Sequence, residues 1–165
     1  MGRIVPYGLS AGGLLVGAVL NMRPDLWGAA IGQVPFVDML NTMSDASHPL
    51  VPLTRPDWGD PLADPAAYDY IASYSPYDNV AAKAYPPVLA TASVADDRVG
   101  YWEPAKWIAK LRAESASGAP MLLVTDMHAG HHGEPGRFQA LRQTAMFFAF
   151  AIQATARRWP CAPPA

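Results

Sequence analysis

Three residue types that together make a catalytic triad occur in this sequence, each after a run of apolar residues. Ser10 lies in Gly8-Leu9-Ser10-Ala11-Gly12, which matches the G-x-S-x-G nucleophile elbow. Such an elbow holds its serine on a strained turn, so that the hydroxyl projects and the next amide, here Ala11, faces a developing oxyanion. Asp96 and His131 follow in the order serine, acid, histidine that accompanies this elbow. The pattern predicts nucleophilic hydrolysis, with Ser10, Asp96 and His131 as catalytic residues.

The sequence leaves two assignments open within this constellation. Asp97 is adjacent to Asp96 and is an alternative acid. Three histidines, His128, His131 and His132, follow the same apolar run, and His131 is favoured because flanking glycines give it a flexible loop. A hydroxyl nucleophile with an imidazole base needs no cofactor and no metal, so none is predicted.

A metal-binding module is a less favoured reading of the same histidine run. Glu134 and Asp126 are the only carboxylates near it, and three histidines in a loop lack the pre-organisation that a helix provides.

The elements that must position these residues alternate along the chain. Expected strands cover residues 3–8, 28–36, 87–93 and 121–127, and expected helices cover 11–22, 64–74, 103–114 and 136–158. Residues 37–63 are expected to be irregular apart from a short helix at 37–43. This alternation predicts an α/β fold with a mostly parallel sheet of about four strands covered by helices. Function then belongs at the carboxyl ends of the strands, where all three candidate residues fall.

Burial is also predicted from the pattern of apolar residues. The strands are nearly continuous apolar runs, which indicates a sheet covered on both faces. The last helix carries apolar residues at alternating spacings of three and four, which predicts one buried stripe. That stripe consists of Phe138, Leu141, Ala145, Phe148 and Ile152.

Composition excludes several classes of protein. The 165 residues are 51% hydrophobic and 16% charged, unlike a disordered chain. A net charge of −2 gives no footprint for nucleic acid, and the single cysteine, Cys161, excludes an intrachain disulfide. No segment is long and apolar enough to predict a membrane span, and no export signal is recognised, so a cytoplasmic location is expected.

Several longer strings resemble the prolyl-oligopeptidase-type serine peptidases, and oligopeptidase B in particular. The resemblance covers about residues 3–155 and corresponds to the C-terminal part of the catalytic domain. Residues 1–159 are therefore assigned to that α/β-hydrolase domain, as a partial fold, and 160–165 to a flexible tail. The strings in question are Gly8-Leu9-Ser10-Ala11-Gly12-Gly13, Gln33-Val34-Pro35-Phe36-Val37-Asp38, Tyr74-Ser75-Pro76-Tyr77-Asp78-Asn79-Val80, Asp96-Asp97-Arg98-Val99 and Ala129-Gly130-His131.

The resemblance implies roles for individual residues. It makes Ser10 the nucleophile of an acyl-enzyme, His131 the base and then the acid, and Asp96 the residue that orients His131. It implies that Arg98 hydrogen-bonds a substrate carbonyl, unless it is only a surface ion pair with Asp97. The implied substrates are short peptides or small esters.

Two further positions are assigned to substrate binding. Phe36 is expected to wall a side-chain pocket. Oligopeptidase B prefers cleavage after Arg or Lys through glutamates before a Trp-Gly-Asn-Pro string. In this chain the region reads Leu53-Thr54-Arg55-Pro56-Asp57-Trp58-Gly59-Asp60-Pro61, which leaves Asp57 alone to receive a basic side chain.

The resemblance also implies a propeller, earlier strands and an upstream tyrosine that serves as second oxyanion donor, and we expect this chain to lack them. The strand before Ser10 is then expected at an open edge of the sheet, where Pro6 is tolerated, and a homo-oligomer through that edge is predicted. The alternative is a non-catalytic fragment that keeps the triad residues without using them.

Overall fold

A single parallel sheet of four strands organises the chain, and the expected α/β fold is confirmed. The computed structural model describes residues 3–156. Its strands lie side by side in sequence order, β1-β2-β3-β4. The register pairs Gly8 with Gly32, and the β2 and β3 strands meet at Ile31 and Leu89. The strands are β1 (Tyr7–Leu9), β2 (Ala30–Gln33), β3 (Val88–Ser93) and β4 (Met121–Asp126).

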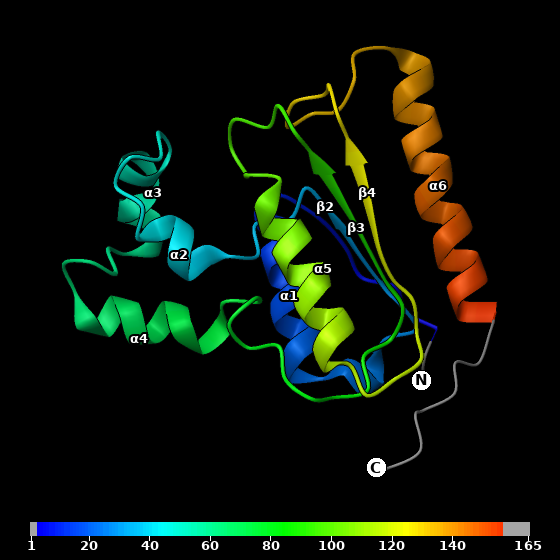
Figure 1. The fold of residues 1–165 in the computed structure, drawn as a ribbon, viewed down its shortest axis with the longest axis horizontal. Coiled ribbons are helices and arrows are strands. Elements are labelled where there is room, and N and C mark those ends of the chain that lie inside the picture. The colour runs from blue at the N-terminus through cyan, green and yellow to red at the C-terminus, as the bar shows by residue number, and fades with distance from the viewer. Residues whose placement is uncertain (1–2, 157–165) are drawn as a thin grey trace.

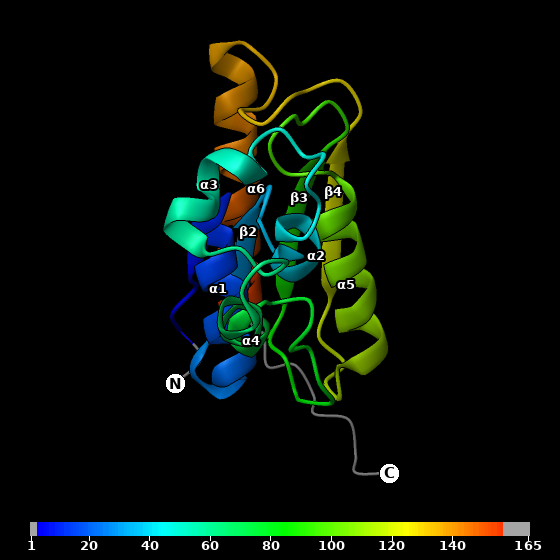
Figure 2. The same cartoon turned by 90° about the vertical axis from the view of Figure 1, so that its left-hand side faces the viewer.

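Helices lie on both faces of this sheet. Helices α1 (Ala11–Met22) and α5 (Trp102–Glu114) cover one face, and α6 (Arg137–Ala156) lies along the other (Figure 1). A short 3-10 turn, Pro24–Leu26, follows α1. Three further helices lie beyond α1, away from the sheet, as the turned view also shows (Figure 2). We call them the helical arm: α2 (Met39–Met43), α3 (Val51–Trp58) and α4 (Pro65–Tyr74).

The main core lies between the sheet and the α1–α5 layer. Trp107, Ile108 and Leu111 of α5 are fully buried against the sheet, where Val88 is buried as well. The helical arm packs on Leu14 of α1 through a second core cluster, to which it contributes Met39, Met43, Val51 and Ile71. The arm is therefore a packed extension of the domain, which places a surface above the end of β1.

One helix of the arm was not expected from the sequence. Residues 37–63 were predicted to be irregular after a short helix, but α3 forms at Val51–Trp58 with Pro56 inside it. Val51 is buried against the arm's other helices, so tertiary packing stabilises a segment whose own helix propensity is poor. The start of α4 was predicted correctly, because Asp64 caps the helix by accepting from the Ala66 N–H at 2.9 Å.

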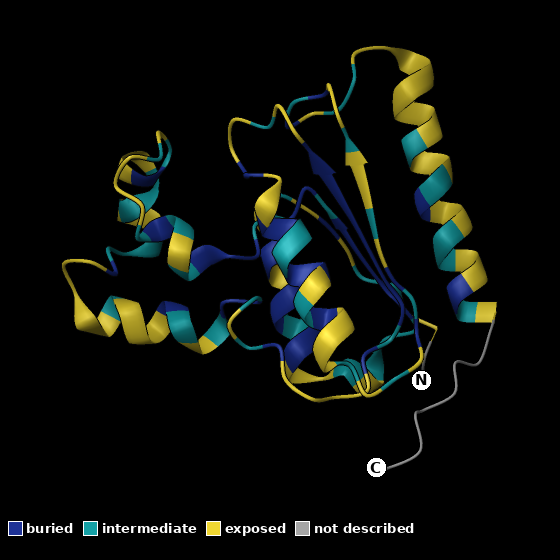
Figure 3. Ribbon diagram, viewed as in Figure 1, coloured by how far each residue is buried: buried dark blue, intermediate teal, exposed yellow. Residues whose placement is uncertain are grey.

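The predicted buried stripe of α6 was wrong. Phe138, Phe148 and Ile152 are 74%, 65% and 68% exposed, and Leu141 and Ala145 are exposed as well. The helix is instead rotated so that Phe147 packs on Ile31 and Leu89 of the sheet. Figure 3 shows that most of α6 is exposed, with only short buried stretches. Two apolar stripes compete on this helix, and spacing alone does not say which of them meets the sheet.

The edges of the sheet are also less covered than predicted. Leu122 and Val124 of β4 remain 42% and 43% exposed, so burial on both faces holds for β3 but not for β4. Within residues 3–156, β1 pairs only with β2, and β1 begins just after Pro6. The predicted homo-oligomer through this edge stays a prediction. No helix in the described range is long and apolar enough to cross a membrane, and the predicted tail at 160–165 lies outside that range.

A buried carboxylate ties the helical arm to the α5 helix. Glu103, in the first turn of α5, is 1% exposed and accepts the N–H groups of Val37 and Asp38 at 3.0 and 2.9 Å. The Thr42 hydroxyl donates to the other carboxylate oxygen at 2.8 Å. Asp38 in turn pairs with Lys106 at 2.5 Å. These bonds fix the start of the arm relative to the sheet, although desolvation raises the pKa of Glu103 to about 7.

Stability is expected to depend on pH through Glu103. Because the pKa of Glu103 is raised from 4.5 to about 7, the folded chain holds more protons than the unfolded chain between these values. The contribution of Glu103 is complete below pH 4.5 and is lost as the pH rises through about 7. The free energy of unfolding of the native chain, relative to Glu103→Gln, should therefore fall by about 3 kcal/mol over this range.

Urea unfolding at a series of pH values measures this difference. Glu114→Gln, at the exposed end of the same helix, is the matched control for the loss of one carboxyl group. A difference between the native chain and Glu103→Gln that does not change with pH would contradict the assignment.

Candidate active site

The turn that holds Ser10 joins β1 directly to α1. Ser10 has a φ of 55°, a left-handed conformation that costs energy for a residue with a side chain. Its backbone is held from both sides, because its N–H donates to Gln33 of β2 at 2.9 Å and its carbonyl accepts the Gly13 N–H at 2.8 Å. The Phe36 N–H also donates to the Ser10 carbonyl, at 3.0 Å. This is the geometry of a nucleophile elbow at the carboxyl end of a strand.

Close backbone contacts explain two of the glycines around Ser10. A Cβ on Gly8 would lie closer than 3.0 Å to the backbone of Gly12, and one on Gly13 would lie equally close to Pro35. The second glycine of the motif, Gly12, would meet nothing within 4 Å. The steric requirement therefore falls on Gly8 and Gly13, which lets β1, α1 and the loop after β2 meet at one point.

Asp96 and His131 form a buried pair beyond the ends of β3 and β4. The His131 Nδ1 lies 2.8 Å from one Asp96 oxygen and 3.0 Å from the other. The exposed fractions of the His131 and Asp96 side chains are 4% and 0%. Asp97, His128 and His132 are exposed. Of the alternatives that the sequence left open, the structure therefore brings together Asp96 and His131.

The loops that carry this pair are bonded to each other and to their own strands. Asp96 also accepts the N–H groups of Arg98 and Val99, each at 2.9 Å. The Ala95 N–H donates to Ala129 at 3.2 Å, which joins the two loops directly. Asp126 closes the histidine loop by accepting the N–H groups of His128 and Ala129, which lower the pKa of Asp126. Backbone hydrogen bonds within each loop and between the two loops thus set the position of His131 relative to Asp96.

Two groups at the elbow remain free for a substrate. Among the described residues, the Ser10 hydroxyl forms no hydrogen bond with His131, and the Ala11 N–H has no acceptor. Hydrogen bonds between a nucleophile and its base are often long before a substrate binds, so the missing bond between Ser10 and His131 is compatible with catalysis. The Ala11 N–H stands at the first position of α1, where helix N–H groups have no partner within the helix.

A cavity of about 150 Å³ opens beside Ser10 and Ala11. Phe36 lines it, and its ring packs edge-on against Trp58, with centroids 6.4 Å apart. Arg98 also lines the cavity, and within the described chain it forms no ion pair with Asp97. Asp57 is exposed on α3 and is not among the lining residues, so the structure does not bring it to the site.

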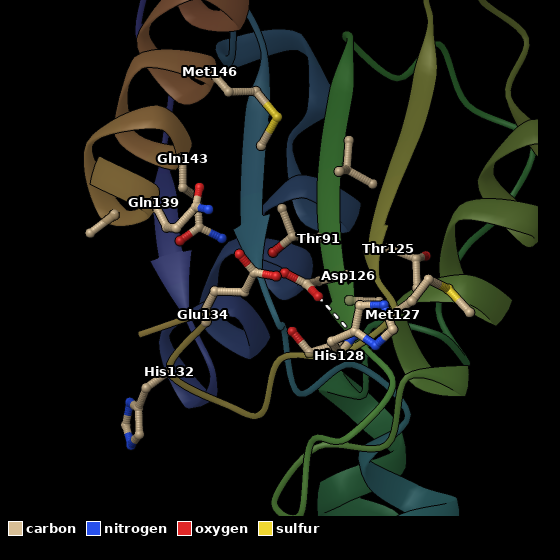
Figure 4. Close-up of a pocket in the computed structure, with 15 residues that line it drawn as sticks. Thr91, Thr125, Asp126, Met127, His128, His132, Glu134, Gln139, Gln143 and Met146 are labelled. Atoms are coloured by element: carbon tan, nitrogen blue, oxygen red, sulfur yellow. Dashed lines mark hydrogen bonds between the residues drawn. The ribbon is translucent and has the colours of Figure 1, made fainter. Parts of the chain in front are cut away.

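A second cavity, of about 430 Å³, lies between α6 and the ends of β3 and β4 (Figure 4). Asp126, His128, His132 and Glu134 line it, but His132 points away from the two carboxylates. No three His, Cys, Asp or Glu side chains in the described part of the chain are grouped so as to hold a metal ion. The metal-binding reading therefore gains no support from the geometry.

Sequence reasoning missed most of the cavity's lining and its support. Thr42, Met43, Thr54 and Trp58 come from the helical arm, and Glu103 anchors that arm from behind. Thr54 and Trp58 lie in the string that was compared with oligopeptidase B, but only Asp57 of that string was assigned a role, and Thr42 and Met43 belong to no recognised motif. The one available signal was a glutamate at the start of an otherwise amphipathic helix, which reads more simply as a favourable charge at a helix N-terminus.

The geometry is that of an α/β hydrolase, with an elbow serine and an acid–histidine pair at the same edge of a parallel sheet. The profile of the prolyl oligopeptidase family matches residues 1–158. The chain belongs to the prolyl oligopeptidase family.

Individual relatives agree with this assignment. Protease 2 of Moraxella lacunata is 50% identical over 150 residues, which cover 91% of this chain and 22% of that protein. Dipeptidyl aminopeptidase BI of Pseudoxanthomonas mexicana is 45% identical over 150 residues, with 91% and 21% covered. The chain thus spans only about a fifth of the length of these relatives.

Solved structures give the same result in three dimensions. Oligopeptidase B from Leishmania major superposes with a TM-score of 0.90 at 43% identity, covering 94% of this chain and 21% of that one. Oligopeptidase B from Trypanosoma brucei with covalently bound antipain, in its closed form, also has a TM-score of 0.90, at 45% identity with 96% and 22% covered. The predicted resemblance to oligopeptidase B is confirmed.

The steric assignment of the glycines predicts an unequal pair of variants. Gly8→Ala should destabilise the fold by about 3 kcal/mol or more, because the new methyl group meets rigid backbone. Gly12→Ala should be neutral or should stabilise by up to about 1 kcal/mol, because alanine favours a helix and the space is open. Thermal or urea unfolding of the two variants checks this, and equal effects would contradict the assignment.

Proposed function

We propose that this chain carries the active site of a serine peptidase that cleaves short peptides or small esters. Ser10 Oγ attacks the substrate carbonyl while His131 accepts the hydroxyl proton. The tetrahedral intermediate collapses to an acyl-enzyme, and His131 returns the proton to the leaving amine or alcohol. Water then attacks the ester, again with His131 as the base, and releases the acid and free Ser10. The observation that carries the proposal is the buried Asp96–His131 pair, which lies at the same edge of the sheet as the Ser10 elbow.

The remaining residues fit supporting roles in this reaction. Asp96 holds the proton on His131 Nδ1, so that Nε2 is free to act as the base. The Ala11 N–H is available to stabilise the oxyanion. Arg98 lines the same cavity and is placed to donate to a substrate carbonyl. The covalent antipain of the Trypanosoma brucei relative is consistent with a nucleophile in this family.

The alternative is a non-catalytic chain that keeps the fold and the triad residues. The exposed β1 edge favours it, since Tyr7 and Leu9 are 53% and 40% exposed there.

The cytoplasmic location expected from the sequence stays a prediction.

Replacing Asp96 should separate catalysis from folding. In Asp96→Asn the new amide oxygen can still accept the N–H groups of Arg98 and Val99, but the amide N–H would face His131 Nδ1 and favour the wrong tautomer. The rate of 4-nitrophenyl acetate hydrolysis should fall by about 10³-fold or more, while the circular dichroism spectrum stays unchanged.

The exposed neighbour provides the matched control. Asp97→Asn should keep the rate within about twofold, because Asp97 lies outside the buried pair. Ser10→Ala should abolish the enzymatic rate. Turnover that survives Ser10→Ala would refute the proposal, and a folded chain without turnover would favour the non-catalytic alternative.

A further inference from the structure

In the part of the chain that the structure describes, no acidic residue lines the cavity beside Ser10, although the whole sequence has 14 of them. Among the described residues that line it, none is a carboxylate and Arg98 is the only permanent cation. Its walls are formed by Phe36, Met43, Val51 and Trp58. A group that enters this cavity therefore meets aromatic and aliphatic surface first.

Three acids near the cavity, Asp38, Asp60 and Glu103, already have partners of their own. Asp60 pairs with Arg55 at 3.2 Å, and Asp38 pairs with Lys106. Glu103 stands behind Thr42, but it is 1% exposed and already accepts from Val37, Asp38 and Thr42. Asp57 and Asp97 are exposed and do not line the cavity, so no carboxylate among the described lining residues would neutralise a cation there, and an unpaired charge is costly to bury.

The size of the cavity bounds the groups that fit. Its volume of about 150 Å³ equals that of an apolar cavity that holds benzene in another protein. An aliphatic or aromatic side chain of about the size of leucine or phenylalanine fits such a space. Ser10 and Ala11 at its rim place that side chain next to the carbonyl under attack.

We propose that this cavity is the specificity pocket for the acyl side of the scissile bond, and that it selects uncharged apolar side chains over Lys and Arg. The inference rests on the proposed function and deepens it. It departs from the expectation that Asp57 receives a basic side chain, because Asp57 faces solvent on α3. Thr54 lines the cavity from the same helix, and its uncharged side chain occupies a position where a carboxylate would bring negative charge into the cavity.

The test compares two esters that differ in one charge. The 4-nitrophenyl esters of N-acetyl-norleucine and N-acetyl-lysine have the same side-chain carbon skeleton, but lysine carries an ammonium group at its end. The native chain should hydrolyse the norleucine ester with a kcat/KM about 10²-fold higher. A preference below about tenfold would overturn the proposal, as would a preference for lysine.

Two variants of one helix locate the selectivity. Thr54→Glu adds a carboxylate to the cavity wall and should lower the norleucine preference by about tenfold or more. Leu53→Glu adds the same charge at a side chain that is 72% exposed, and should leave the preference within about twofold. Equal effects of the two variants would overturn the assignment of the cavity. If Thr54→Glu does not fold, the comparison of the two esters on the native chain decides alone.

Failure of the proposed function gives a different result. Ser10→Ala would then hydrolyse both esters as fast as the native chain. If Ser10 is required and lysine is preferred, only the selectivity proposal is wrong.

Discussion

The close approach of three backbone segments around Ser10 is the constraint on which the rest of the structure depends. Gly8 of β1 passes against α1, and Gly13 of α1 passes against Pro35, in the loop that follows β2. That loop returns a hydrogen bond from the Phe36 N–H to the Ser10 carbonyl. One contact region therefore fixes the strained serine and the Phe36 wall of its cavity together, because neither can move without displacing backbone. The helical arm extends this arrangement through Glu103, whose buried carboxylate holds the residues that follow Phe36.

Asp96 and His131 are positioned by different means from Ser10. Their loops extend beyond β3 and β4 and are joined by the hydrogen bond from the Ala95 N–H to the Ala129 carbonyl. Asp96 uses both oxygens, since it organises its own loop and holds His131. The parallel sheet brings this pair and the serine elbow to one edge, although Asp96 lies 86 positions after Ser10 in the chain and His131 lies 35 positions after Asp96.

Much of this site could be predicted because its signals are local. A glycine-flanked serine between a strand and a helix, and polar residues directly after apolar strands, follow from short stretches of sequence. The alternation of elements predicted the parallel sheet in the same way. Tertiary choices could not be read so directly. Helix α6 carries two apolar stripes, and the stripe that contains Phe147 packs on the sheet while Phe138 and Phe148 face outward. Helix α3 forms around a proline because Val51 is buried in the arm. The role of Glu103 could not be predicted, because its three partners all lie more than 60 positions away in the chain.

The central claim is that the buried Asp96–His131 pair activates Ser10 in this chain. Reaction with a fluorophosphonate, followed by intact mass, tests it most directly, because the reagent modifies an activated serine and needs no knowledge of the substrate. The account predicts one label per chain on the native protein and none on Ser10→Ala. A native chain that is folded by circular dichroism but takes up no label would contradict the claim.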